Sequence, residues 1–355
     1  MKLSASANSK MSDLLRERVA LVFNWYQGME NGETGMLEYL YIPQADRFVR
    51  ENCLIRDIAS VWDAELIGEF LNKHELQPMI EKSLHHFDEY LTEREGHLIL
   101  DSSPLGESSS IAHSAFMILA LLYAPPARRK KEIAGLAEGI LQQQTADGSY
   151  KVCFADLPDH GEELYAGEAM LALMEVHRQL GDARFLQSVE HGFAYYDACY
   201  FRGGRVGDDL LVFFANWQSQ ACRLLFECTA NAVLKRNVGR YIFAMHDRIV
   251  DRGFYGDMER HPERQVSVEV ACALEGLNDA YSIARSLKDE RADRYRHFIC
   301  TGLEYLLELQ CTDTGTTKER GGFGVSLSER AEWIDITGHA ASAFIKGVEN
   351  GIECG

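Results

Sequence analysis

The chain has 355 residues, 46% of them hydrophobic, which is enough to bury a large core. Its formal net charge of −18 argues against nucleic acid or an anionic membrane surface as a general partner. No apolar run reaches the length of a membrane span, and residues 111–124, the nearest approach, include His113 and Ser114. The polar segment 1–11 lacks the apolar core of a signal peptide, and we expect it to be disordered ahead of a single domain over 12–355.

Nine cysteines are spread irregularly along the chain, without a Cys-x-x-Cys motif or a Cys/His ligand set. We therefore expect no metal and no cofactor. The odd number and the irregular spacing favour reduced thiols on buried helix faces, which predicts a cytoplasmic protein. The expected partner is a small molecule or an oligosaccharide, and a homodimer is left open.

Hydrophobicity with a helical period predicts twelve helices in six pairs. They span residues 13–28, 54–71, 77–91, 109–123, 127–144, 163–180, 183–201, 213–230, 232–250, 266–284, 293–310 and 334–350. Every second helix is rich in Ala, Leu, Ser and Cys and has few charges near its centre, which predicts burial. The others carry frequent Lys, Arg, Glu and His, which is typical of helices with one solvated face.

The third pair shows the repeating unit most clearly. Apolar residues including Leu164, Leu171 and Val176 cover most of the surface of the first helix, so we expect it to be buried nearly all round. Gly181 is expected to end this helix, and Asp182 to cap the next one. A buried helix, a tight turn and an amphipathic helix make one helical hairpin.

The connections between the predicted helices differ in length. The connections from a buried helix to the following, more solvent-exposed helix are short, at 72–75, 124–126, 181–182 and 231. Those from a wetter helix to the next buried helix are long, at 29–53, 92–108, 145–162, 202–212, 251–265 and 311–333. In a ring of hairpins the long loops would share one face, together with the N-termini of all the buried helices. We predict an all-α, closed (α/α)6 toroid with its pocket at that mouth; a linear solenoid is the alternative.

Three stretches resemble the six-hairpin glycosidase and sugar-epimerase superfamily, in particular bacterial proteins similar to the C-terminal domain of D-glucuronyl C5-epimerases. They run from Leu164-Tyr165-Ala166-Gly167-Glu168-Ala169 through Gly181-Asp182-Ala183-Arg184-Phe185-Leu186, from Gly321-Gly322-Phe323-Gly324 through Ile334-Asp335-Ile336-Thr337-Gly338-His339-Ala340, and over Asn52-Cys53-Leu54-Ile55-Arg56-Asp57. The resemblance covers most of residues 13–350 and implies the (α/α)6 toroid. For function it implies a sugar epimerase or a glycoside hydrolase that works by acid/base catalysis.

Other enzymes with similar toroids keep further functions open. Terpenoid cyclases, protein prenyltransferases and lanthionine synthetases are built this way, so a terpenoid-cyclase-like or peptide-modifying enzyme is one alternative. The acid-rich Asp-x-Asp-Asp motif of squalene-type cyclases is absent from the sequence. A non-catalytic toroid that binds a ligand is a third possibility.

Polar residues near the start of the buried helices are the candidate site, because those helix ends face the mouth. The catalytic candidates, which could serve as acid and base on a sugar, are Glu168, Glu269 and His339. The candidates for substrate binding are Arg56, Asp57, His113, Tyr165, Trp217, Gln220 and Asp335. Arg56 would hold an anionic group, and Trp217 would stack against a sugar ring.

Each candidate also has a structural interpretation. Asp335 could simply cap its helix, and Arg56 with Asp57 could form a structural ion pair. The two histidines could be satisfied core residues. Packing accounts for Trp217 as well as sugar stacking does. Tyr165 and Glu168, three residues apart, share one face of an otherwise apolar helix.

Overall fold

The computed structural model describes residues 11–32, 34–49, 53–123, 129–155, 160–312 and 318–354. Of the segment expected to be disordered, Met11 begins the first helix, and residues 1–10 lie outside the described part of the chain. Asn52, the first residue of one of the resembling stretches, also lies outside it.

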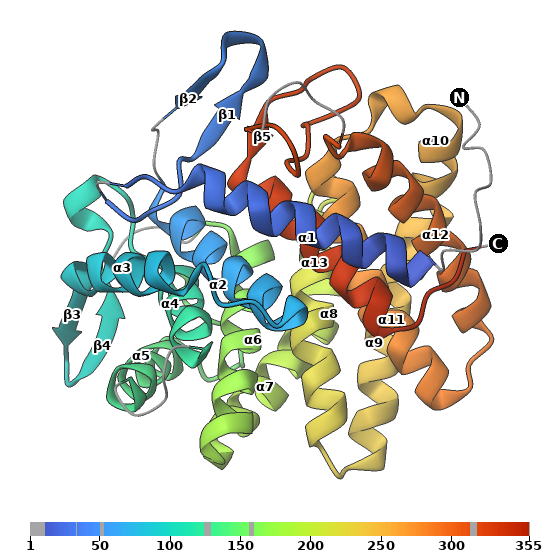
Figure 1. Ribbon diagram of the computed structural model, residues 1–355. Coiled ribbons are helices and arrows are strands. Elements are labelled where there is room, and N and C mark those ends of the chain that lie inside the picture. Colours follow the sequence, from blue (N-terminus) through green and yellow to red (C-terminus); the bar gives the residue numbers. More distant parts are fainter. Residues whose placement is uncertain are drawn as a thin grey trace.

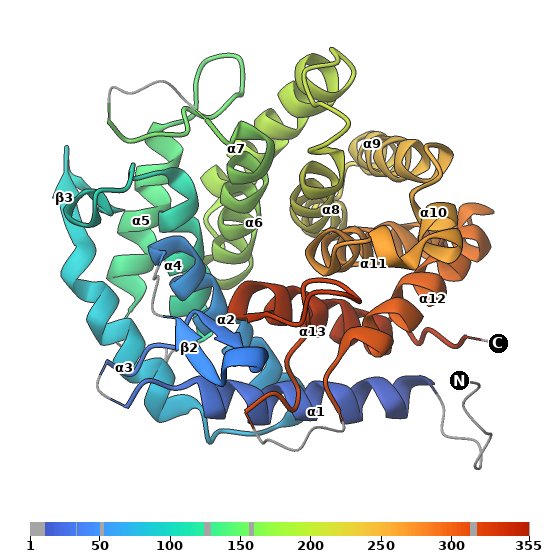
Figure 2. The same cartoon turned by 90° about the horizontal axis from the view of Figure 1, so that it is seen from above.

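Within the described residues, six inner helices form a closed ring, and six outer helices surround it (Figure 2). The inner helices are α2 (Leu54–Leu71), α4 (Ile111–Tyr123), α6 (Glu162–Leu180), α8 (Leu211–Cys228), α11 (Ser267–Leu287) and α13 (Ile334–Glu349). The outer helices are α1 (Met11–Met29), α3 (Gln77–Phe87), α5 (Lys130–Gln142), α7 (Ala183–Tyr195), α9 (Ala232–Asp251) and α12 (Arg291–Leu309). Each inner helix packs against the next, and α13 packs against α2, so the predicted (α/α)6 toroid is confirmed.

The character of each helix follows from its residues. In α4 every residue from Ile111 to Leu122 is buried, as expected for a helix that is apolar all round. The turn of the third hairpin is built as predicted: Gly181 ends α6 in the left-handed conformation, with its N–H bonded to the His177 carbonyl. Asp182 then caps α7 by accepting a hydrogen bond from the backbone N–H of Arg184.

The long connections contain elements that the hydrophobic period did not predict. β1 (Leu40–Ile42) pairs antiparallel with β2 (Arg47–Val49) and also with β5 (Glu332–Trp333), at the upper edge of Figure 1. β3 (Leu91–Arg94) and β4 (His97–Leu100) form a hairpin, and β4 packs against α5. The helix predicted over 77–91 therefore ends at Phe87, because the chain turns there into this hairpin. A short helix, α10 (Phe254–Arg260), lies between α9 and α11.

Hydrogen bonds between the two ends of the chain close the ring. The indole N–H of Trp25 donates to Oε2 of Glu332 at 2.8 Å, and the Tyr26 hydroxyl donates to the carbonyl of Ile334 at 3.0 Å. The register of β1 with β5 places Leu40 opposite Trp333, so the loop after α1 is also tied to the loop before α13. The first outer helix thus completes the sixth hairpin with the last inner helix.

Buried charges fill the interior of the ring toward the C-terminal ends of the inner helices. Oδ1 of Asp279 on α11 lies 2.8 Å from Nε of Arg223 on α8, and its Oδ2 accepts a hydrogen bond from Nζ of Lys346 on α13 at 2.7 Å. Asp279 is only 3% exposed, so its carboxylate depends on these two cations for its charge. These side chains join three inner helices at the ends where those helices finish.

The expectation of reduced thiols is wrong for one pair. Cys300 on α12 and Cys354 in the C-terminal tail form a disulfide with their Cα atoms 5.5 Å apart. They are 54 residues apart in sequence, and spacing alone gives no sign that the tail returns to α12. Among the described residues, the other seven cysteines lie outside this disulfide. In the described part of the chain, the helices are too short or too polar to cross a membrane.

Candidate functional site

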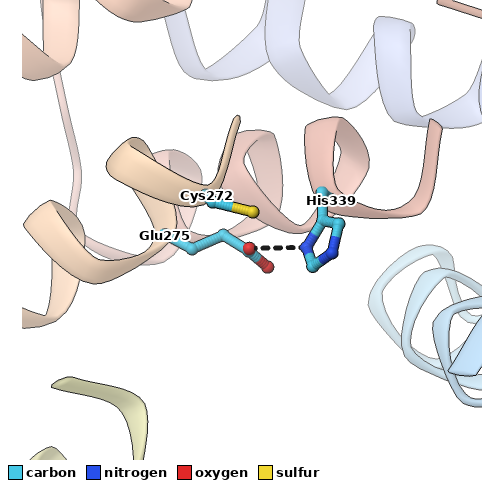
Figure 3. A group of neighbouring side chains, drawn as sticks. All are labelled: Cys272, Glu275 and His339. Atoms are coloured by element: carbon cyan, nitrogen blue, oxygen red, sulfur yellow. Dashed lines mark hydrogen bonds and ion pairs between the residues drawn. The ribbon is translucent and has the colours of Figure 1, made fainter. Parts of the chain in front are cut away.

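Three side chains from two inner helices meet inside the ring (Figure 3). Cys272 and Glu275 lie three residues apart on one face of α11, and His339 comes from α13. Nδ1 of His339 lies 2.8 Å from Oε2 of Glu275, and one possible ligand atom from each of the three residues lies within 4.8 Å of the other two. We call Cys272, Glu275 and His339 the central cluster.

A chain of hydrogen bonds from α8 fixes the carboxylate of the central cluster. Nδ2 of Asn216 donates to Oε2 of Glu275 at 3.0 Å, and Nε2 of Gln220 donates to Oδ1 of Asn216 at 3.0 Å. Asn216 is fully buried, so its amide has little freedom to rotate. Gln220, predicted to bind substrate, therefore reaches the cluster through Asn216.

The neighbours of His339 in the central cluster stabilise its protonated form. Burial alone would lower the pKa of His339, but its contacts with Cys272 and Glu275 outweigh that effect and raise the pKa well above 6.5. Burial raises the pKa of the Cys272 thiol, and His339 opposes that rise. His339 therefore holds its second proton more tightly than an isolated histidine does.

Two further acids lie near the cluster, and both keep their protons more tightly than usual. Burial raises the pKa of Asp63, on α2, to about 8, with His339 opposing the rise. Burial likewise raises the pKa of Glu168, on α6, to about 8, again opposed by His339. Glu168 is 3% exposed, and its Oε2 has no hydrogen-bond partner among the residues that the structure describes. Groups with a pKa near neutrality are suited to proton transfer.

Trp217 packs between the cluster and α4. Its ring meets His339 edge to face at 5.8 Å and Phe116 at 5.6 Å, and the side chain is 5% exposed. These contacts account for Trp217 as a packing residue that orients the imidazole. Sugar stacking on its face remains a prediction.

Arg56 forms a second polar group at the start of α2. Its Nε lies 3.2 Å from Oδ2 of Asp335, the second residue of α13, and its NH1 donates a hydrogen bond to the Tyr39 hydroxyl. The guanidinium also lies over the rings of Tyr39 and Trp333, at 5.7 and 5.9 Å. Asp335 on α13 thus forms an ion pair with Arg56 on α2. The predicted ion pair of Arg56 is therefore made with Asp335 rather than with Asp57.

Two other predicted residues lie near the starts of α4 and α6. His113 is held by the Ser110 hydroxyl at 2.8 Å and by Glu107 at 3.4 Å, which makes it a satisfied, buried histidine. Tyr165 is half-buried, and its pKa is raised by burial and then by the charge of Glu168. Tyr165 therefore lies beside Glu168, as their shared helix face predicts.

Glu269 and Asp57 do not join the central cluster. Glu269 lines a surface cavity of about 240 Å³ with Asp208 and Arg252, between α8, α9 and α10. Asp57 is buried, and its backbone N–H bonds to the carbonyl of Cys53. The pKa of Tyr90, which follows the outer helix α3, is raised chiefly by burial, and the charge of Asp57 adds to the rise. The surface cavities beside Asp247, Glu269 and Phe154 are lined by residues outside the central cluster, so the predicted pocket at the mouth stays a prediction.

Sequence reasoning missed Asp63, Cys272, Glu275 and Asn216. We looked for polar residues in the first turns of the inner helices, whereas Asp63 and Glu275 are the tenth and ninth residues of theirs. An isolated charge inside a run such as Ala271–Leu277 is a usable signal, because an acid there needs a partner. The partner itself is 64 residues away on another helix, and no local motif reveals it.

Comparison with known proteins supports the fold. No family model matches the chain, and no curated protein matches it in sequence. Among solved structures, a D-mannose isomerase aligns over 98% of this chain and 100% of its own, with a TM-score of 0.69 and 11% identity. An unsaturated glucuronyl hydrolase from Bacillus sp. GL1 aligns over 95% and 97%, with a TM-score of 0.64 and 12% identity.

A third similar structure is an α-1,6-mannanase of Salegentibacter sp. HEL1_6, an inactive variant in complex with α-1,6-mannotetrose. It aligns over 95% of this chain and 99% of its own, with a TM-score of 0.65 and 11% identity. At these identities the three structures show that the fold is shared, and nothing beyond the fold.

Proposed function

We propose that this chain is a carbohydrate-active enzyme that moves a proton at a sugar carbon next to a carbonyl, as an isomerase or epimerase does. The observation that carries the proposal is the contact between His339 and Glu275, with the buried Oε2 of Glu168 nearby, which has no hydrogen-bond partner among the described residues. The fold that the chain shares with a D-mannose isomerase supports a sugar as the substrate. Several acids beside a Trp favour a sugar over an isoprenoid, for which an aromatic, acid-poor interior would be expected.

The proposed reaction divides the work between an acid and a base. A carboxylate, from Glu168 or Asp63, removes the proton from the carbon next to the sugar carbonyl. The His339 imidazolium, held by Glu275, gives a proton to the carbonyl oxygen, so that a neutral enediol forms. Return of the proton to the former carbonyl carbon, while the other enediol hydroxyl gives its proton to the now neutral imidazole of His339, makes the ketose. Return of the proton to the original carbon on the other face, while the first hydroxyl gives its proton back to His339, makes the epimer.

Hydrolysis is the second candidate, and one observation favours it. Asp63 and Glu168 are two carboxyl groups near one histidine, and a glycosidase needs a pair of carboxyl groups. The mannanase and the glucuronyl hydrolase share the fold. A hydrolase would keep one of the two acids protonated as the acid for the leaving group and ionise the other.

One experiment separates the two reactions. The protein is incubated in D2O with D-mannose and, separately, with α-1,6-mannotetrose, and both are followed by proton NMR. An isomerase or epimerase makes a second sugar and exchanges a carbon-bound proton for solvent deuterium. A hydrolase shortens the tetrasaccharide and leaves carbon-bound protons in place. A broader panel of aldoses and ketoses follows if mannose is inert.

The variant His339→Asn tests the assigned acid. General acid–base catalysis contributes about 10²- to 10⁴-fold, so turnover should fall by at least about 100-fold, with the far-UV circular dichroism unchanged. His85→Asn, on the exposed face of α3, is the matched control and should keep full turnover. A fully active His339→Asn variant would show that the central cluster is not the site of reaction.

A further inference from the structure

The central cluster offers one sulfur, one oxygen and one nitrogen donor, from Cys272, Glu275 and His339. Ca²⁺ and Mg²⁺ favour sites made of oxygen atoms alone, whereas thiolate and imidazole ligands are typical of Zn²⁺ and other transition metals. The imidazole of His339 interacts with both the carboxylate of Glu275 and the thiol of Cys272, so the three donor groups face one another.

We propose that Cys272, Glu275 and His339 form a binding site for a divalent transition metal ion, with Zn²⁺ as the best-matched ion. The proposal goes beyond the sugar chemistry above, since the ion would bind whether or not a sugar is turned over. It assigns to the thiol a role that proton transfer leaves open.

The geometry of the cluster is close to what Zn²⁺ requires. Metal–ligand bonds of about 2.0–2.3 Å at tetrahedral angles place two ligand atoms roughly 3.3–3.7 Å apart. The donor atoms now span up to 4.8 Å, and the shortest pair, Nδ1 of His339 and Oε2 of Glu275, is 2.8 Å apart. An ion that replaced the proton between these two atoms would push them apart by less than about 1 Å and draw the sulfur inward. Figure 3 shows the three side chains turned toward a common space.

The surroundings hold the ligands as the outer shell of a metal site does. Asn216 fixes Oε2 of Glu275 at 3.0 Å, and Gln220 fixes Asn216. Trp217 contacts the His339 ring and limits its rotation. Outer-shell hydrogen bonds of this kind typically contribute about 10- to 100-fold to metal affinity.

Three protein ligands leave one tetrahedral position for water or for a substrate oxygen, which is typical of a catalytic rather than a structural zinc site. Binding of the ion would release the proton on Nδ1 of His339 and the proton of the Cys272 thiol to solvent, and the metal would then take over from the imidazolium as the group that polarises a carbonyl. The metal-bound and the metal-free protein would therefore differ in chemistry, and the proposed sugar reaction can fail while the ion still binds.

The test uses the full-length protein without sugar. Purified protein, stripped with a chelator, is titrated with Co²⁺ and followed by visible and near-ultraviolet absorption. Zn²⁺ affinity is then measured by competition with a chromophoric chelator, and bound zinc is counted by elemental mass spectrometry. We expect one ion per chain, with a thiolate-to-cobalt charge-transfer band.

Variants assign the ligands. Cys272→Ser should remove the charge-transfer band and weaken Zn²⁺ binding by at least about 100-fold, whereas Cys228→Ser, a half-buried free cysteine on α8, should change neither. Asn216→Ala should weaken binding by about 10- to 100-fold while keeping the band. His339→Gln is the second ligand variant if Cys272→Ser does not fold. A wild-type protein without the band, or with zinc affinity equal to that of Cys272→Ser, would overturn the proposal.

Discussion

Glu168 is a carboxyl group that folding removes from water without giving Oε2 a hydrogen-bond partner among the described residues. Its pKa rises from 4.5 to about 8, chiefly through burial. Between these two values the folded chain holds a proton that the unfolded chain has lost. The free energy of unfolding therefore falls as the pH rises through this window, by up to about 1.4 kcal/mol for each pH unit.

The variant Glu168→Gln tests whether Glu168 causes this fall in the free energy of unfolding with rising pH. A neutral amide of nearly the same size has no proton to lose, so the free energy of unfolding of the variant should depend less steeply on pH between 5 and 8. Relative to the wild type, the variant should be most favoured near pH 8 and least favoured near pH 5. The measurement is urea-induced unfolding at a series of pH values.

A control separates this effect from the general charge of the protein. Glu190→Gln removes a carboxylate from the half-buried side of the outer helix α7 and should leave the pH slope of the wild type unchanged. Identical slopes for the wild type and Glu168→Gln would show that Glu168 ionises normally in the folded protein.

Residue patterns predicted part of the site, and the limit has a physical cause. Glu168 and His339 could be found because each is polar on an otherwise apolar inner helix. Glu269 met the same rule, yet on α11 it is turned toward α9 and α10, since a helix start shows only which end of the ring a residue occupies. The direction around the helix depends on packing between helices, which no single helix encodes.

At the level of elements, small residues set how closely the inner helices approach. A Cβ added at Gly167 on α6 would lie 2.6 Å from Cβ of Trp217 on α8. A Cβ added at Gly338 on α13 would overlap the carboxylate of Asp63 on α2 and lie 3.0 Å from the Tyr26 hydroxyl. The missing Cβ of Gly167 leaves room for Trp217, and that of Gly338 leaves room for Asp63. Both glycines therefore allow a side chain of the candidate site to lie close against the neighbouring helix.

Gly338→Ala should destabilise the fold even though alanine is the better helix former. Overpacking typically costs about 1–3 kcal/mol, which exceeds the roughly 1 kcal/mol that alanine gains over glycine inside a helix. Asp63 would have to move, so we also expect loss of turnover. Urea-induced unfolding measures the first effect and the sugar assay the second.

Gly28→Ala is the matched control, because Gly28 lies in α1 with open space within 4 Å of an added Cβ. It should be neutral or stabilising by up to about 1 kcal/mol. Equal stabilities for the wild type and Gly338→Ala would mean that α2 and α13 are not in close contact at this point.

Helices were the part of the fold that sequence predicted well, because the hydrophobic period repeats over many residues. The strands β1, β2 and β5 were missed, since each has only two or three residues, and the pairing of β1 with β5 joins loops about 290 residues apart. The π-helical segment Tyr196–Phe201, which extends α7, was included in the predicted helix 183–201. Its wider turn leaves no mark on the hydrophobic period over so few residues.

At the scale of the whole molecule, the ring depends on contacts between the two ends of the chain. α1 packs on α13, and Nε2 of Gln310 donates to the carbonyl of Arg18 at 2.9 Å. We call this region, where the first and last helices of the chain meet, the seam. Each inner helix has an inner helix on both sides only when the seam is closed. The disulfide between Cys300 and Cys354 lies at the same seam, where Glu353 also accepts a hydrogen bond from the backbone N–H of Met11.

The variant Cys354→Ser tests how much the disulfide contributes to closing the ring. Joining residues 54 apart restricts the unfolded chain, and native disulfides typically contribute about 2–4 kcal/mol. The variant should unfold at a lower urea concentration, and a reductant should lower the wild type to the same midpoint while leaving the variant unchanged. Cys199→Ser, which removes an exposed free thiol, is the control and should behave as the wild type.

Thiol titration of the denatured wild type should find seven free thiols, and nine after reduction. If nine are found without reductant, the two cysteines are neighbours that do not pair, and the seam is held by the contacts of α1 alone.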